Sequence, residues 1–175
     1  MKKRMTDMRR LADRNIIVTG LLVLLFLGGC GNEGENDLLS GRPAPDFRVA
    51  GLKGGTFQPA ALAGKPVLLE FWAPWCAGCL ENIEVVNNLY RRFENDVHFI
   101  APSSEQGKKS LAYFVTRRNI TYPVAISNRE IIDNYGVGSI PLTVLIDDKG
   151  MIRFRHTGQI RYKEMADRLN RLLAD

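Results

Sequence analysis

Two cysteines, Cys76 and Cys79, have the residue type and the spacing to carry out chemistry. They stand three positions apart in the stretch FWAPWCAGC, directly behind a tryptophan. Such a pair can store two electrons by cycling between dithiol and disulfide, supply half of a metal site, or link a loop permanently. The surrounding sequence has to decide among these three roles.

The residues around the pair predict a junction between a strand and a helix. The run VLLEFWA, residues 67–73, is apolar apart from one acid and is bounded by prolines, which is typical of a buried central strand. Unpaired N–H groups and the dipole at the start of a helix favour the thiolate of the first cysteine. Cys76 is therefore the expected nucleophile, and Cys79, one helical turn later, is expected to resolve the mixed disulfide. Apolar residues follow at helical spacing, namely Ile83, Val86, Leu89, Tyr90 and Phe93.

The two other roles of the pair are less well supported. A zinc site needs two further ligands, but the two histidines, His98 and His156, have no other histidine or cysteine at ligand spacing, so no metal is expected. Both fall within strand patterns and are expected to be structural or solvent-facing. A permanent link across two residues removes little conformational entropy from the unfolded chain, so it would stabilise the fold only slightly.

The length and composition fit one globular domain. The chain has 175 residues, of which 45% are hydrophobic and 25% charged. Its formal net charge is +5, but six basic and two acidic residues lie within positions 1–29, so the remainder carries only +1. This balance gives no indication of nucleic-acid binding.

Residues 1–29 have the pattern of an export signal. A basic start precedes the apolar run Ile16–Leu27 and two glycines. A spanning helix needs roughly 20 apolar residues, more than this run has. The residues LGGC, ending at Cys30, resemble the lipobox of bacterial lipoproteins, which implies cleavage before Cys30 and a lipid on its sulfur. Lipidation would also account for the odd number of cysteines. A retained membrane anchor, or a Cys30 that is buried or removed, is the alternative.

We therefore expect three regions: a signal peptide at 1–29, a lipidated cysteine with a polar, glycine-rich flexible tether at 30–42, and a domain at 43–175. The domain would lie outside the cytoplasm and be anchored to a membrane, on the periplasmic side or on the outer face of the cytoplasmic membrane.

Strand and helix patterns alternate along the domain. Asp147–Gly150 is a turn signal that joins the last two strands as an antiparallel hairpin. This order predicts an α/β fold with a central mixed sheet and helices on both faces. The further strands are expected at 97–103, 122–127, 141–147 and 151–158, and the further helices at 108–119, 129–136 and 161–173.

Three stretches carry a resemblance to a known family. APDF at 44–47, GKPVLLEFWAPWCAGC at 64–79 and YGVGSIPLTVLIDDKG at 135–150 are similar to the thioredoxin superfamily, specifically to its membrane-anchored TlpA- and ResA-like branch. The resemblance implies a thioredoxin-like fold with the active site at a strand-to-helix junction. It also implies that Cys76 is the attacking cysteine and Cys79 the resolving one.

The resemblance assigns roles to residues around the pair. It implies a cis peptide bond before Pro141, so that the backbone of Ile140 faces the cysteines and pairs with an extended substrate segment. Glu70 matches a buried acid that exchanges protons with the second cysteine, and its apolar surroundings independently predict burial and a raised pKa. The alternative for Glu70 is a strand edge or bulge, with the carboxyl bonded to backbone.

Two tryptophans flank this site. Trp75 is expected to form part of the substrate-docking surface, and Trp72 to pack in the core. Between the cysteines the chain has Ala77-Gly78 where thioredoxin has Gly-Pro, so the redox potential does not follow from the resemblance.

The resulting hypothesis is a lipid-anchored, monomeric enzyme that reduces protein disulfides outside the cytoplasm. Apocytochrome c is the substrate that the family suggests, and electrons would come from a membrane dithiol donor; no cofactor is expected besides the redox-active disulfide. One alternative is an oxidase or isomerase that forms disulfides in secreted proteins. Another is an anchored binding or assembly module with a minor redox role.

Overall fold

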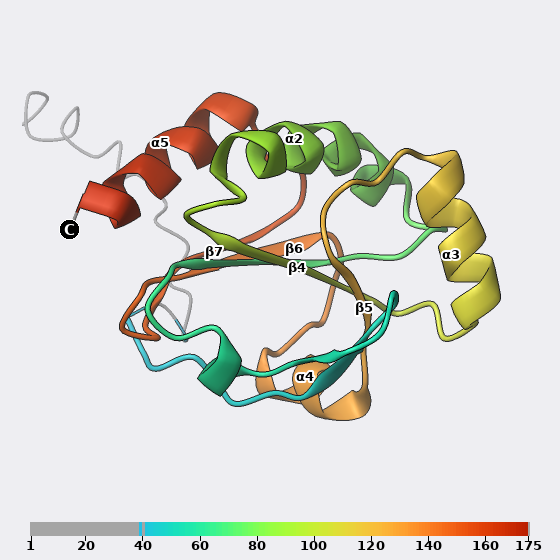
Figure 1. Cartoon of the computed structure of the whole chain (residues 1–175), viewed down its shortest axis with the longest axis horizontal. Coiled ribbons are helices and arrows are strands. Elements are labelled where there is room, and N and C mark those ends of the chain that lie inside the picture. Colours follow the sequence, from blue (N-terminus) through green and yellow to red (C-terminus); the bar gives the residue numbers. More distant parts are fainter. Residues whose placement is uncertain (1–38, 40, 175) are drawn as a thin grey trace, which may run out of the picture. The chain divides into compact units, whose positions relative to one another are not determined.

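A mixed sheet of seven strands organises the described part of this computed structural model, which comprises residue 39 and residues 41–174 (Figure 1). The strands lie side by side in the order β2-β1-β5-β4-β3-β6-β7. They are β1 (Val49–Gly51), β2 (Thr56–Phe57), β3 (Val67–Phe71), β4 (His98–Ser103), β5 (Val124–Ile126), β6 (Leu142–Ile146) and β7 (Ile152–Thr157).

Strand β3 lies in the interior of the sheet, as its apolar sequence predicts. It runs parallel to β4 on one side and antiparallel to β6 on the other, and all five of its residues are buried. Parallel pairing of β3, β4 and β5 followed by the antiparallel hairpin β6-β7 confirms the predicted mixed sheet.

Helices cover both faces of the sheet, as predicted. Helices α2 (Ala77–Phe93), α3 (Lys108–Arg117) and α5 (Tyr162–Ala174) lie over one face, and α4 (Arg129–Asn134) lies over the other, together with the 3-10 turn η1 (Pro59–Ala61) (Figure 1). Each face has its own apolar core.

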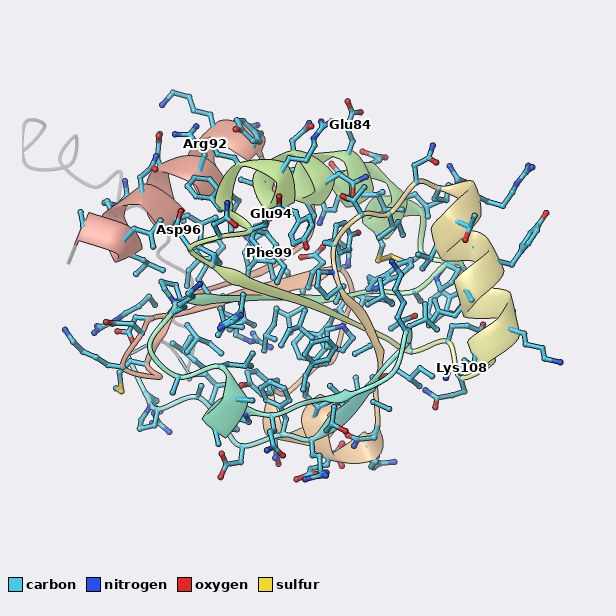
Figure 2. All side chains as sticks on the ribbon, viewed as in Figure 1. Glu84, Arg92, Glu94, Asp96, Phe99 and Lys108 are labelled. Carbon is cyan, nitrogen blue, oxygen red and sulfur yellow. A yellow bond between two sulfur atoms is a disulfide. The ribbon has the colours of Figure 1, made fainter. Side chains whose placement is uncertain are left out.

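The predicted apolar stripe of α2 faces the sheet. Ile83, Val86, Leu89 and Phe93 are buried, whereas Glu84 points away from the sheet. Phe99 of β4 lies between the sheet and α2 and packs against Tyr90, with ring centroids 5.3 Å apart (Figure 2). This packing fixes the position of α2, and with it the position of the cysteines at its N-terminus.

The turn between β6 and β7 is held by Asp147. Its carboxyl accepts hydrogen bonds from the backbone N–H groups of Lys149 and Met151, and it forms an ion pair with Arg153. Although burial raises it, these donors hold the pKa of Asp147 below its usual value. Asp147 therefore stabilises the turn of the hairpin that the sequence predicts at residues 147–150.

Two strands have no sequence signal of their own. Strands β1 and β2 contain three and two residues, too few for a recognisable alternation. Strand β1 pairs antiparallel with β5, and β2 pairs antiparallel with β1 at the edge of the sheet. Ahead of them, the backbone of Gly41 and Arg42 hydrogen-bonds to Ile152 at the start of β7. Residues 1–38, which include the predicted signal, Cys30 and most of the predicted tether, lie outside the described residues. Among the helices of the described part, none is both long and apolar enough to cross a membrane.

Candidate active site

Cys76 occupies the N-cap of α2, where the chain leaves the sheet. Its backbone is extended, with φ −88° and ψ 109°, and its Sγ accepts a hydrogen bond from the backbone N–H of Cys79 at 3.2 Å. This N–H is one of the groups that an α-helix leaves without an internal partner. The same donor can stabilise the Cys76 thiolate when the pair is reduced.

Cys76 and Cys79 are joined in a disulfide across the first turn of α2, with their Cα atoms 5.2 Å apart. Their exposure differs: Cys76 retains 9% of its surface and Cys79 only 2%. A partner arriving from solvent therefore meets Cys76 first. The geometry fits the predicted order, with Cys76 attacking and Cys79 resolving.

The peptide bond between Ile140 and Pro141 is cis, as the resemblance implies. The carbonyl oxygen of Ile140 lies 3.7 Å from the Sγ of Cys76. Pro141 also lies beside α2, because a Cβ added to Gly78 would be 3.5 Å from its Cδ. The turn before β6 thus places backbone polar groups beside the accessible sulfur, where an extended segment can pair with them.

The two tryptophans have opposite environments. Trp75 is 71% exposed beside Cys76, while Trp72 is buried, donates from Nε1 to the carbonyl of Ala101 at 3.3 Å and packs against Phe114. The predicted core position of Trp72 is confirmed. The exposed indole of Trp75 offers apolar area next to the reactive sulfur.

Glu70 is buried in the middle of β3 on the face that α2 covers, with 2% of its surface exposed. It lies opposite Thr143 of the neighbouring strand β6, so the alternative of a strand edge or bulge is wrong. Burial raises the pKa of Glu70 to about 7, and hydrogen bonds from Thr143 and Asn82 lower it in part. A carboxyl group with this pKa can take up and release a proton at neutral pH.

Two partners of Glu70 were not identified from the sequence. Asn82 of α2 donates from Nδ2 to Oε1 of Glu70 at 2.8 Å, and the Thr143 hydroxyl donates to Oε2 at 2.5 Å. Both side chains are buried. The available signal was a polar residue on the buried stripe of α2, one turn after Cys79, and a hydroxyl within an apolar strand.

The histidines lie apart from the cysteine pair. His98 begins β4, beside Val67 at the opposite end of β3, and its pKa is lowered by burial and by the charge of Lys65. His156 is on the outer strand β7, where its Nε2 lies 3.1 Å from the carbonyl oxygen of Gln159. Across the described residues, no three histidine, cysteine, aspartate or glutamate side chains gather in a way that could hold a metal ion.

Residues 40–155 match the AhpC/TSA family. The chain belongs to this family. It is 29% identical to the thioredoxin-like protein YneN of Bacillus subtilis over 163 residues, which cover 87% of this chain and 96% of that protein. It is 32% identical over 149 residues to the thiol-disulfide oxidoreductase ResA of Bacillus anthracis, covering 79% of this chain and 86% of ResA.

Solved structures of the same fold agree with this assignment. A thiol:disulfide interchange protein of the thioredoxin family from Chlorobium tepidum superposes with a TM-score of 0.69 at 22% identity, covering 75% of this chain and 95% of that one. A thiol-disulfide isomerase from Corynebacterium glutamicum gives a TM-score of 0.67 at 23% identity, with coverages of 75% and 97%. These two structures support the fold alone.

The family membership and the ResA relatives confirm the TlpA- and ResA-like assignment within the thioredoxin superfamily. Together with the disulfide at the start of α2, they identify this AhpC/TSA family member as a thiol-disulfide oxidoreductase.

Proposed function

We propose that this oxidoreductase reduces disulfides of exported proteins outside the cytoplasm, with apocytochrome c as the candidate substrate. The observation that carries this proposal is the arrangement at Cys76, the less buried of the two cysteines: its Sγ lies 3.7 Å from the Ile140 carbonyl oxygen, and the residue before it, Trp75, is exposed. An extended protein segment can pair with this backbone edge while its own sulfur meets Cys76. The leader pattern of residues 1–29 supports the location.

The proposed reaction moves two electrons from the dithiol to the substrate. The Cys76 thiolate attacks one sulfur of a substrate disulfide; that bond breaks, and the other substrate sulfur leaves as a thiolate. Cys79 then loses its proton and attacks Cys76, which releases the second substrate thiolate and forms the Cys76–Cys79 disulfide. A membrane dithiol donor returns the pair to the reduced state through the same steps in reverse.

Glu70 is the proposed base for the second step. Cys79 is buried and has to be deprotonated before it attacks. With a pKa of about 7, the Glu70 carboxyl is ionised in part at neutral pH and can accept this proton. Each substrate thiolate that leaves takes up a proton from water.

The lipid anchor completes the proposal. A thioether-linked lipid on Cys30 would hold the domain at the membrane that contains its electron donor. Replacement of Cys30 by serine is expected to release the protein from the membrane fraction and to remove its incorporation of labelled fatty acid. A Cys30→Ser variant that stays in the membrane without the label would instead support a retained anchor.

The reduction potential of the Cys76–Cys79 pair tests the direction of electron flow. The purified protein is equilibrated with glutathione or dithiothreitol buffers, and the reduced fraction is measured. A potential below roughly −220 mV supports a reductant, whereas one above roughly −150 mV overturns this proposal in favour of an oxidase. Replacing both cysteines by serine provides the second test. A reductase then loses all activity, and a binding or assembly module keeps its function.

A further inference from the structure

The side chain of Asn82 joins the buried carboxyl of Glu70 to a loop behind the docking edge. Its Oδ1 accepts a hydrogen bond from the backbone N–H of Ile160 at 3.1 Å, and its Nδ2 donates to Glu70 Oε1 at 2.8 Å. The same Nδ2 lies 3.4 Å from the carbonyl oxygen of Gly158. Only 2% of Asn82 is exposed, so water does not compete for these contacts.

The backbone contact with Ile160 fixes the orientation of the Asn82 amide. A backbone N–H can only donate, so the oxygen of Asn82 has to face it, and the NH₂ group has to face Glu70. An NH₂ group can only donate as well. Glu70 Oε1 is therefore held as an acceptor, and a proton on Glu70 has to sit on Oε2.

The other partner of Glu70, Thr143, can form a hydrogen bond with the carboxyl group in either of its protonation states. The Thr143 hydroxyl can donate to an ionised Oε2 or accept from a protonated one. The carboxyl can thus gain and lose its proton at Oε2 without losing its contact with Asn82. Asn82 therefore fixes which oxygen of Glu70 carries the proton, and Thr143 is the hydrogen-bond partner of that oxygen in both protonation states.

The loop that Asn82 contacts supports the turn at Pro141. Residues 158–161 link β7 to α5, and the backbone N–H of Gly158 donates to the carbonyl of Pro141 at 2.8 Å. Pro141 follows Ile140, whose own carbonyl faces the Cys76 sulfur. One side chain on α2 therefore holds both the carboxyl group and the backbone behind the substrate edge.

We propose that Asn82 is a positioning residue for the resolving step, which keeps Oε1 of Glu70 as an acceptor, so that the proton is exchanged at Oε2, and fixes loop 158–161 behind Pro141. This inference rests on the proposed role of Glu70 as the base that deprotonates Cys79. Asn82 acts through Glu70 and through the loop, and it takes no part in the bond changes.

Other titratable groups face Glu70 and enter the design of the test. Tyr122, which precedes β5, has its pKa raised by burial and by the charge of Glu70, so its phenol stays neutral throughout the neutral range. His156 of β7 lies opposite Thr143 in the strand register. The reaction of the cysteines of α2 is the quantity measured.

The resolving step can be followed separately from the attack. The reduced full-length chain is mixed with the disulfide of thionitrobenzoate in a stopped-flow instrument. Attack by Cys76 releases the first thionitrobenzoate, and attack by Cys79 on the adduct releases the second. The rate of the second phase is recorded across about pH 5 to 9, where Glu70 titrates.

Replacement of Asn82 by alanine is expected to move the midpoint of this profile upward by about one pH unit, because the carboxylate loses a donor. The first phase should change less than about twofold. In a reduction assay with insulin, KM should rise at least about threefold because the loop behind Pro141 is no longer held. Thr143→Val should move the midpoint without raising KM, and His156→Gln should move neither.

Unchanged midpoint and unchanged KM in a folded Asn82→Ala protein would overturn the proposal. If alanine prevents folding, as judged by circular dichroism, Asn82→Leu fills a similar volume and has the same expected outcome. Glu70→Gln tests the proposed base on which the Asn82 role rests. The part of the pH profile with a midpoint near 7 should disappear, which leaves only the rise in rate that follows the ionisation of Cys79 itself. A midpoint near 7 that persists would reject Glu70 as the base and the Asn82 role with it. An oxidising reduction potential would reject only the proposed direction, since the resolving step is the same in either direction.

Discussion

The carbonyl oxygen of Ile140 lies 3.7 Å from the Sγ of Cys76. This contact joins two segments that are 64 positions apart in the sequence and places the accessible sulfur at the end of a backbone edge. Cys79, its partner in the disulfide, is buried behind it. Cys76, with 9% of its surface exposed, is therefore the less buried of the two cysteines, which is the asymmetry that a two-step exchange needs.

The first prediction concerns this asymmetry. In the reduced protein at neutral pH, limiting iodoacetamide should alkylate Cys76 in preference to Cys79 by at least about tenfold, because Cys76 is the less buried of the two and occupies the N-cap. Mass spectrometry of the digested protein measures the ratio. Equal labelling of a folded sample would contradict the assignment of Cys76 as the attacking residue.

The second prediction compares the two tryptophans. Trp75→Ala should raise KM for a protein disulfide but change the free energy of unfolding by no more than about 0.5 kcal/mol, because the indole is exposed. Trp72→Ala should cost about 3–5 kcal/mol, because it opens a cavity in the core. Insulin reduction and urea unfolding measure the two quantities. A large loss of stability in Trp75→Ala would place that indole in the core instead.

Local patterns in the sequence predicted the elements that position the site. Strand β3 is a short apolar run bounded by prolines, and α2 has an apolar stripe at helical spacing, so both were evident from neighbouring residues. The turn at Asp147–Gly150 was evident for the same reason. The cis bond before Pro141 followed from the resemblance alone.

The contacts of Glu70 could not be predicted in this way. Thr143 is 73 positions from Glu70, and Asn82 is 78 positions from Ile160, so only the completed fold brings these pairs together. A polar residue on an apolar stripe indicates that a partner exists but not which one. Strands β1 and β2 are too short to show a period, and they depend on the pairing of β1 with β5 and of β2 with β1.

The third prediction concerns the dependence of stability on pH. The pKa of Glu70 is about 7 in the folded protein, against 4.5 for a glutamate side chain in water. Between these values the folded state binds more protons than the unfolded state, so the contribution of Glu70 to stability falls as pH rises through this window. Glu70→Gln should therefore stabilise the oxidised protein by about 3 kcal/mol at pH 8 and have little effect near pH 4.5.

Urea unfolding at both pH values measures this difference. Glutamine keeps the cluster satisfied, because its oxygen can accept from Asn82 and its amide can donate to the Thr143 hydroxyl. The wild-type protein at each pH serves as the reference. An equal difference at both pH values would show that the effect comes from packing and not from the ionisation of Glu70.

The fourth prediction concerns Gly78, which lies between the cysteines. Its φ is not in the left-handed region, and an added Cβ would lie at ordinary contact distance, 3.5 Å, from the Cδ of Pro141. Gly78→Ala should therefore stabilise the protein by about 0.4–1 kcal/mol, because alanine loses less conformational entropy in the first turn of α2. Urea unfolding of the oxidised protein measures this gain.

Gly136, which closes α4, is the matched control. Its φ is +57°, where a Cβ is strained, so Gly136→Ala should destabilise the protein by about 1–2 kcal/mol. The two substitutions make the same chemical change and differ in backbone conformation. A loss of stability in Gly78→Ala would mean that Pro141 cannot give way to even one methyl group, and that glycine between the cysteines is required to bring α2 against the docking edge.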